Sequence, residues 1–283
     1  MPLKFTKMHG LGNDYVLMSL FDQRVRAPAE LARALSDRHR GVGSDGLILV
    51  GPPESDDADV RMLVFNADGS RAQMCGNGIR CLAKLCHEHG LARQNPMRIA
   101  TDAGVLTLEL TCTADDQVAL VRVDMGAPVL EPWRIPVALG GQRVVAAPLP
   151  LRAHVLSVTC VSFGNPHAVF FTDDVSSEPL AQWGPEIERH PLFPERINVH
   201  FAQVLAPERV RMITWERGTG LTHACGTGAS AVCVAGVLNR LTERAITAEL
   251  PGGELSLVWD EPSNHVFMTG PATEVFQGQW PDE

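Results

Sequence analysis

Two short cysteine-glycine motifs hold the residues best suited to chemistry. Cys75–Gly78 and Cys225–Gly228 both read Cys-Gly-x-Gly, and each opens a segment with the apolar pattern of a helix. A cysteine at the first turn of a helix lies beside unpaired backbone N–H groups and the positive end of the helix dipole, which stabilise a thiolate. The glycines let a ligand approach the backbone, and the same N–H groups bind a carboxylate or phosphate. Each motif therefore predicts a reactive thiol beside an anion site.

One such motif alone has an ordinary structural explanation. A single cysteine before a helix is more often inert than catalytic, and Gly-x-Gly without a third spaced glycine is no dinucleotide fingerprint. A pair of motifs is more informative, because two thiols on either side of one α-carbon can remove a proton from one face and deliver a proton to the other. Donors at two helix ends would stabilise the carboxylate as it gains enolate character. This chemistry needs no electron-sink cofactor, and we expect none.

The elements that must position the two thiols occur twice in the chain. The predicted helices are Pro28–His39, Gly76–His89, Glu178–His190 and Gly226–Arg240, and the strand-rich segments are Asp59–Phe65, Met97–Asp124, Val210–Trp215 and Ile246–Thr269. The distance from the Gly-Asn pair at Gly12 to Cys75 is 63 residues, and from that at Gly164 to Cys225 it is 61 residues. Self-similarity at such a long period indicates a duplicated domain. We expect domains at residues 1–125 and 126–270, with about 271–283 returning to the first.

The two helices that follow the cysteines differ in apolar pattern. In the first, the apolar residues fall on one face, and Arg80 and Lys84 lie off that face. In the second, apolar residues surround the axis, so we expect it to be buried on nearly all sides.

Composition narrows the class of protein. The 24 Lys and Arg against 33 Asp and Glu give a net charge of 24 − 33 = −9, which disfavours nucleic acids and anionic membranes as partners. The longest apolar run, Ala229–Leu238, is shorter than the roughly 20 residues of a membrane helix. Met1–Asp14 has no apolar block of the kind found in a secretion signal. These features predict a soluble, cytoplasmic protein.

The seven cysteines do not indicate a disulfide scaffold, because their number is odd and no CxxC pair occurs. A zinc site of Cys81, Cys86, His87 and His89 is conceivable, but the spacing of the two cysteines does not match structural zinc pairs. We therefore predict no metal and expect most of the thiols to be buried.

Both cysteine blocks resemble the signatures of one enzyme family. Met74–Cys81 and Glu216–Gly228 are similar to the two cysteine signatures of diaminopimelate epimerases. The remaining family blocks are matched, in family order, by Gly10–Asp14, Phe65–Gly69, Gly164–His167 and Ile197–Val199. The resemblance implies a PLP-independent isomerase that interconverts LL- and meso-2,6-diaminopimelate in lysine and peptidoglycan precursor biosynthesis.

The same resemblance carries expectations about fold and assembly. It implies an α+β protein of two similar, pseudo-symmetric domains, each a curved, mostly antiparallel sheet around a central helix. The active site would lie in the interdomain cleft, and the cytoplasmic enzyme would be a homodimer. Its only other partner would be a small amino-acid substrate.

The resemblance also assigns roles to single residues. Cys75 and Cys225 would be the catalytic acid/base pair. The substrate-binding residues would be Asn13, Asn66, Gly76, Asn77, Asn165, Asn198, Glu216, Arg217, Gly226 and Thr227. His167 and Glu216 would tune the protonation of the thiols. An amino-acid group at each end of the substrate needs cation acceptors and anion donors together, and an arginine suits a carboxylate bidentately.

Two positions depart from expectation, and three alternatives stay open. Gly46 stands where many family members carry a substrate-contacting Gln, and His223 is unexpected beside the second cysteine. The nearest alternative is a related two-cysteine proline or hydroxyproline racemase or epimerase. The others are a thiol redox switch and a duplicated small-ligand binding module.

Overall fold

The computed structural model describes residues 2–281. Contacts divide the chain into two compact units, which are Met1–Val123 with Thr269–Glu283, and Asp124–Met268. We call these unit 1 and unit 2 and describe each by itself. No helix among residues 2–281 is both long and apolar enough to cross a membrane.

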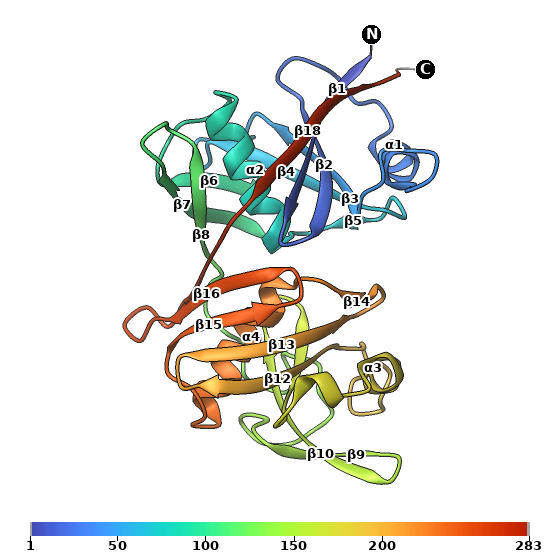
Figure 1. Ribbon diagram of the computed structural model, residues 1–283, viewed down its shortest axis with the longest axis vertical. Helices are drawn as coiled ribbons and strands as arrows, with labels where there is room; N and C mark the ends of the chain where they lie inside the picture. The colour runs from blue at the N-terminus through green and yellow to red at the C-terminus, as the bar shows by residue number, and fades with distance from the viewer. Residues whose placement is uncertain (1, 282–283) are drawn as a thin grey trace. The chain divides into compact units, whose positions relative to one another are not determined.

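Unit 1 is built on a sheet with two helices in its connections (Figure 1). Its elements are β1 (Leu3–Gly10), β2 (Asn13–Ser19), α1 (Pro28–Ser36), β3 (Gly46–Gly51), β4 (Val60–Asn66), β5 (Arg71–Ala72), α2 (Gly76–Glu88), β6 (Met97–Thr101), β7 (Gly104–Cys112), β8 (Val118–Asp124) and β18 (Thr273–Trp280). The pairs β2–β3 and β4–β6 are parallel, whereas β1–β18, β1–β2, β3–β4, β4–β5, β6–β7 and β7–β8 are antiparallel.

Unit 2 repeats this pattern of pairing. Its elements are β9 (Ala147–Leu151), β10 (His154–Ser162), β11 (Pro166–Phe171), η1 (Val175–Ser177), α3 (Leu180–Glu188), β12 (Asn198–Ala206), β13 (Arg209–Glu216), β14 (Gly220–Thr222), α4 (Gly226–Leu238), β15 (Ala245–Leu250), β16 (Gly253–Trp259) and β17 (Val266–Gly270). The pairs β11–β12 and β13–β15 are parallel, and β9–β10, β10–β11, β12–β13, β13–β14 and β15–β16 are antiparallel.

The two pairing schemes correspond strand for strand. β1 to β7 match β10 to β16, and every parallel pair is joined through a helix, as parallel strands require. In this correspondence Tyr15 pairs with Gly46 in unit 1, and His167 pairs with Asn198 in unit 2. The mixed α+β class expected from the sequence is confirmed, and equivalent positions in the two units are compared below on this alignment.

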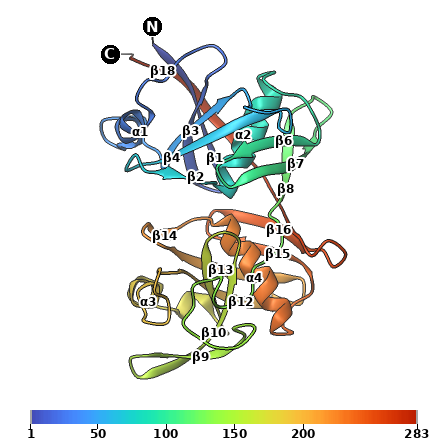
Figure 2. The ribbon, with the colours of Figure 1, turned by 180° about the vertical axis from the view of Figure 1, so that it is seen from behind.

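The helices α2 and α4 occupy equivalent places in the two units (Figures 1 and 2). α2 contacts β1, β2, β3, β7 and β18, and α4 contacts β10, β11, β12, β15 and β16. Each helix thus packs against strands that precede it in the chain and strands that follow it. In α4 the residues from Gly228 to Gly236 are all buried, which agrees with its apolar sequence.

The shorter helices α1 and α3 cover other strands. α1 packs on β3 and β4, and α3 packs on β12, β13 and β14. α1 ends earlier than its sequence pattern predicts, because Asp37 leaves the helical conformation and its carboxylate accepts hydrogen bonds from the backbone N–H groups of His39 and Arg40. α3 begins after Pro179 rather than at Glu178, whose carboxylate accepts a hydrogen bond from Thr172.

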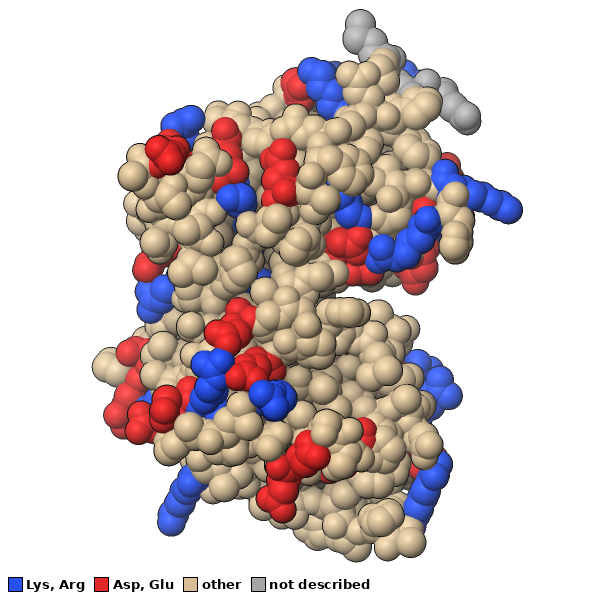
Figure 3. All heavy atoms as spheres, in the orientation of Figure 1, with Lys and Arg blue, Asp and Glu red and all other residues tan. Residues whose placement is uncertain are grey.

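The charged surface is mixed in sign. On the face shown in Figure 3, blue and red side chains lie in small groups beside one another. Arg209, for example, forms ion pairs with both Glu249 and Glu254.

Candidate active site

The first cysteine caps α2. Cys75 has extended backbone angles (φ −141°, ψ 116°), and its Sγ accepts a hydrogen bond from the backbone N–H of Gly78 at 3.3 Å. A Cβ on Gly78 would lie 2.5 Å from Cδ1 of Ile48, so glycine lets the helix approach β3 closely. The motif therefore places a sulfur at the helix N-terminus, where negative charge is stabilised.

Polar groups from β2 and α2 lie beside the Cys75 sulfur. The hydroxyl of Tyr15, the only tyrosine in the chain, lies 3.1 Å from Sγ. The Cys75 thiol donates to Oδ1 of Asn13 at 3.7 Å, and Nδ2 of Asn77 donates to the same oxygen at 3.1 Å. Two of the predicted binding residues thus lie beside the predicted catalytic cysteine.

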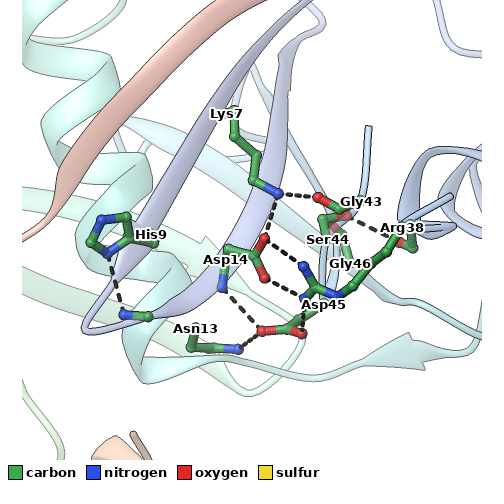
Figure 4. A network of polar contacts seen from close by, with 11 residues as sticks. Lys7, His9, Asn13, Asp14, Arg38, Gly43, Ser44, Asp45 and Gly46 are labelled. Carbon is green, nitrogen blue, oxygen red and sulfur yellow. Dashed lines mark hydrogen bonds and ion pairs between the residues drawn. The ribbon is translucent and has the colours of Figure 1, made fainter. Parts of the chain in front are cut away.

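A carboxylate network fixes the orientation of Asn13 (Figure 4). Nδ2 of Asn13 donates to Asp45 at 2.7 Å, and Asp45 also accepts from Arg38. Because a carboxylate only accepts hydrogen bonds, the amide nitrogen must face Asp45 and the amide oxygen must face Cys75.

The network continues from Asp45 into the core of unit 1. Asp14 binds Arg38 at 2.8 Å and also pairs with Lys7, whose ammonium donates to the carbonyl of Gly43 (Figure 4). Burial acts to raise the pKa of Asp14, but the hydrogen bonds from Arg38 and Lys7 outweigh it and lower the pKa. Asp14 therefore stays ionised.

Arg80 corrects a prediction, because it lies inside unit 1 and not off the buried face of its helix. It has no exposed surface, and its guanidinium donates to the carbonyls of Gly76 and Pro271 and to Oδ1 of Asn77. Burial lowers the pKa of Arg80. The charge interactions with Cys81 and Cys75 act in the opposite direction but do not outweigh burial. The apolar pattern failed here because three acceptors compensate the buried cation.

The remaining predicted positions of unit 1 lie at one end of β3 and β4. The amide of Asn66 donates to Ser70 Oγ at 2.9 Å, and Gly46 pairs with Asn66 across the sheet. A Cβ at position 46 would lie 3.2 Å from the Tyr15 ring and would clash with the carbonyl of Phe65. In this chain, position 46 therefore has no room for a glutamine side chain.

The second cysteine caps α4 in the same way. Cys225 is extended (φ −129°, ψ 108°), and its Sγ accepts from the N–H of Gly228 at 3.4 Å. A Cβ on Gly228 would lie 2.9 Å from both ring nitrogens of His200. Cys225 is buried, whereas Cys75 is partly exposed.

The hydroxyl nearest to the Cys225 sulfur belongs to a hydrogen-bonded group of uncharged side chains. The hydroxyl of Thr227 lies 3.6 Å from Sγ, and Nδ2 of Asn165 donates to that hydroxyl at 3.3 Å. His167 is hydrogen-bonded through Nε2 to Oδ1 of Asn165 at 3.0 Å and through Nδ1 to Nε2 of His200 at 2.9 Å.

The two buried histidines of this group are uncharged. Burial lowers the pKa of His200 to about 3. Burial, followed by the nearby His200 and the charge of Arg217, lowers the pKa of His167 well below its usual value. At neutral pH both rings are therefore neutral imidazoles.

Asn198 supports the loop that carries Arg217. Its Nδ2 donates to the carbonyl of Pro166 at 2.8 Å, and its Oδ1 accepts from the backbone N–H of Arg217 at 2.9 Å. Beside it, Glu216 accepts a hydrogen bond from Thr222 at 2.7 Å. The buried carboxylate of Glu188 accepts from Gly218 in the same loop.

Sequence reasoning missed several residues of these two groups. Tyr15 was detectable as the residue two positions after Asn13, matching His167 after Asn165. No sequence motif pointed to Asp45 or His200. Only the fold brings Asp45 to Asn13 and His200 to His167. His223 contributes its backbone carbonyl to the N–H of Gly252.

The thiols outside the two motifs behave as expected for small buried residues. Cys81, Cys86, Cys160 and Cys233 are buried, and Cys112 is exposed. Burial raises the pKa of Cys81 to about 12.

The conceivable zinc group of Cys81, Cys86, His87 and His89 is not brought together in residues 2–281. His87 lies instead with Cys112 and Asp116, whose possible ligand atoms are all within 4.8 Å of one another. Asp116 in that group is already paired with Arg93.

Comparison with solved structures identifies the fold. A probable proline racemase from Agrobacterium radiobacter superposes with a TM-score of 0.74 at 18% identity, covering 99% of this chain and 93% of that one. A PhzF-family phenazine biosynthesis protein from Bacillus anthracis gives 0.72 at 14% identity, with full coverage of both chains. At these identities the similarity shows a shared fold.

Comparison of sequences is more specific. The profile of the family described as diaminopimelate epimerase matches residues 5–131 and 159–275. The diaminopimelate epimerase of Acetivibrio thermocellus is 50% identical over 277 residues, covering 98% of each chain. That of Desulfovibrio desulfuricans is 49% identical over 284 residues, again covering 98% of each chain. The chain, an isomerase, belongs to the diaminopimelate epimerase family.

Proposed function

We propose that the chain converts LL-2,6-diaminopimelate to meso-2,6-diaminopimelate with Cys75 and Cys225 as its two acid/base groups. One observation carries the proposal. Each of these cysteines caps an equivalent helix, and its sulfur accepts the N–H of the glycine three residues on. A helix N-terminus stabilises a thiolate, which is the form that can remove a proton.

The reaction needs one thiolate and one thiol at the start. The thiolate takes the α-proton and becomes a thiol, while the electron pair of the C–H bond passes to the α-carbon and the adjacent carboxylate. The opposite thiol then donates its proton to the other face of the carbon and becomes a thiolate. No atom is gained or lost, and the stereocentre is inverted.

The carboxylate at the reacting carbon requires donors as its charge grows. We assign this task to the backbone N–H groups of Gly76, Asn77, Gly226 and Thr227. They lie in the first turns of α2 and α4, where N–H groups lack partners within the helix. Donors fixed in advance cost little reorganisation during the reaction.

The second amino-acid group of the substrate requires both signs of charge. We assign its carboxylate to Arg217 and its ammonium group to Glu216, with Asn13, Asn66, Asn165 and Asn198 as the other polar contacts. Proline lacks this second group, so an enzyme for proline has no use for the Glu216-Arg217 pair. The homologues at about half identity favour the same substrate.

The proposal includes the expected assembly. Units 1 and 2 would be pseudo-symmetric domains, each a curved sheet around its central helix, with the active site in a cleft between them. Two such chains would form a homodimer. His167 and Glu216 would tune the protonation of the thiols.

Solvent exchange with matched substrates tests this function. In deuterium oxide, the wild-type protein should convert LL-diaminopimelate to meso-diaminopimelate that carries deuterium at the inverted α-carbon, and it should place no deuterium on L-proline. Cys75→Ala and Cys225→Ala should each lose epimerisation by at least about 10²-fold, since positioned acid/base groups contribute about that much or more. Exchange into proline alone, or full epimerisation by either variant, would overturn the proposal.

The other two alternatives give different outcomes in the same assay. A ligand-binding module would bind diaminopimelate without exchange and would tolerate both alanine variants. A redox switch would be fully active or inactive according to the oxidation of its thiols. We expect a disulfide between Cys75 and Cys225, if formed with an oxidant, to be inactive, so turnover by the fully oxidised protein would contradict our account.

A further inference from the structure

A continuous series of hydrogen bonds leads from the interior of unit 2 to the Cys225 sulfur. It begins at Thr214 Oγ1, which lies 3.0 Å from Nδ1 of His200. It continues through His167 and the side-chain amide of Asn165 to the hydroxyl of Thr227, which contacts Sγ. Thr214, His167 and His200 are buried, so water is no substitute for these partners.

The amide oxygen of Asn165 determines which atoms donate and which accept in the part of the series from Asn165 back to Thr214. Its oxygen only accepts, so Nε2 of His167 carries the proton of that ring. A neutral imidazole has one N–H, so Nδ1 of His167 accepts a hydrogen bond from Nε2 of His200. By the same rule Nδ1 of His200 accepts from the hydroxyl of Thr214.

The amide nitrogen of Asn165 determines the donors in the remaining part of the series, from Asn165 to Cys225. Nδ2 of Asn165 donates to Thr227 Oγ1, which turns the hydroxyl proton of Thr227 away from the amide. The hydroxyl of Thr227 also lies 3.6 Å from the sulfur of Cys225, which accepts its proton. Every donor in the series therefore points toward Cys225.

The matching positions of unit 1 do not form such a series of hydrogen bonds. Ile48 occupies the place of His200, because each packs against the second glycine of its motif, Gly78 or Gly228. Tyr15 occupies the place of His167. Asn13, the counterpart of Asn165, presents its oxygen and not its nitrogen to the cysteine.

We propose that His200 is a positioning residue, which acts through His167 and Asn165 to hold the Thr227 hydroxyl as a hydrogen-bond donor to the Cys225 sulfur. The donated hydrogen bond favours the thiolate of Cys225 over its thiol. The inference rests on the proposed function for its role in catalysis, but the hydrogen-bond series itself does not.

Ionisable groups occur within this series and at the end of strand β13. They are His167 on β11, His200 on β12, Cys225 before α4, and Glu216 and Arg217 at the end of β13. Both histidines are uncharged at neutral pH for the reasons given above. The hydroxyl of Thr227 lies at the end of the series beside the sulfur, and the N–H of Gly228, in the first turn of α4, donates to the same sulfur.

Alkylation of the two cysteines against pH tests the proposal without substrate. Iodoacetamide reacts with thiolates, and peptide mass spectrometry reports Cys75 and Cys225 separately in the same sample. The pH midpoint of each curve is independent of how exposed the sulfur is. We expect Thr227→Val to raise the Cys225 midpoint, so that its alkylation below the midpoint slows about tenfold, whereas Thr227→Ser should stay near wild type.

The decisive variant is remote from the sulfur. His200→Ile introduces the residue that unit 1 carries at the matching position, and it removes both ring nitrogens from the series. We expect alkylation of Cys225 below its midpoint to slow about threefold and Cys75 to be unchanged. If this variant does not fold, Thr214→Val removes the hydroxyl at the start of the series with almost no change of volume, and we expect a change in the same direction.

The outcomes separate the two proposals. Unchanged Cys225 midpoints in folded His200→Ile and Thr227→Val, or equal shifts at Cys75, would overturn the positioning role. Absence of deuterium exchange into diaminopimelate by the wild type would overturn the proposed function and leave the midpoints as they are. In an active enzyme, His200→Ile should also move the acidic limb of the kcat/KM profile to higher pH.

Discussion

The two units place a cysteine on the same scaffold but surround it with different chemistry. In both, the sulfur caps a helix whose third residue is a glycine packed against a strand. Around Cys75 the partners lead to charged groups, namely Arg80 on one side and Asp45 on the other. Around Cys225 they lead to two neutral histidines.

The comparison separates the features that the two units share from those in which they differ. The helix N-terminus and its glycines are the same because any thiolate at this position needs them. Different side chains behind the two sulfurs agree with the proposed mechanism, in which one cysteine starts as a thiolate and the other as a thiol.

The largest difference should appear at Arg80 and its counterpart Ser230. Both side chains donate to the first carbonyl of their helix, but Arg80 also binds Pro271 and Asn77. Arg80→Ala should lower the free energy of unfolding by about 3–5 kcal/mol, through a cavity and unpaired acceptors. Ser230→Ala should cost about 1 kcal/mol. Denaturant unfolding measures both, and equal losses would contradict the central role of Arg80.

The second difference between the units concerns the pH dependence of the free energy of unfolding, because unit 2 buries His200 where unit 1 buries Ile48. The pKa of buried His200 is about 3 in the folded protein, so between about pH 6.5 and pH 3 the unfolded chain binds a proton that the folded chain does not. Stability therefore falls as pH falls through this range, by up to about 1.4 kcal/mol per pH unit for this ring.

His200→Ile removes that dependence and provides the comparison. The slope of unfolding free energy against pH should decrease by up to the contribution of one histidine. Urea titrations at several pH values between 4 and 7 measure it. Identical slopes in the wild type and the variant would show that His200 takes up its proton in the folded state.

The second glycines of the two motifs, Gly78 and Gly228, should differ in their tolerance of a methyl group. At Gly228 a Cβ meets the ring of His200, which is hydrogen-bonded at both nitrogens, whereas at Gly78 it meets the terminal methyl of Ile48. Gly228→Ala should therefore cost about 1–3 kcal/mol. Gly78→Ala should cost less, because a terminal methyl can move. The reverse order in thermal unfolding would contradict this packing.

The smallest effect is expected at Tyr15. Its hydroxyl is 3.1 Å from Cys75 Sγ, and a single hydrogen bond contributes about 0.5–1.5 kcal/mol. Tyr15→Phe should therefore reduce kcat/KM for diaminopimelate by about 2- to 12-fold, with the ring packing kept. An unchanged value would mean that the hydroxyl does not contribute to the state of Cys75.

Much of the fold was visible in the sequence because it depends on local signals. The apolar patterns located α2 and α4 to within about two residues of their ends, and the repeated motifs anticipated equivalent helices. α1 ended early because the side chain of Asp37 competes with the next helical turn.

The surroundings of the sulfurs were less visible because they come from distant positions. Arg80 was expected outside the apolar face, since no local pattern shows that Pro271 will supply a carbonyl. His200 joins His167 only because β11 and β12 pair in parallel, with His167 opposite Asn198. Such contacts follow from strand register, which the sequence pattern alone did not determine.

The central claim is that two different thiols handle the two protons, and the early distribution of deuterium tests it most directly. LL-diaminopimelate is incubated with the wild-type protein in deuterium oxide, and both stereoisomers are analysed while little product has formed. Two acid/base groups predict that meso-diaminopimelate carries deuterium at the inverted carbon while the remaining LL-isomer keeps its hydrogen. Deuterium appearing equally early in the unreacted LL-isomer would indicate a single group that returns solvent protons to both faces, and would contradict the account.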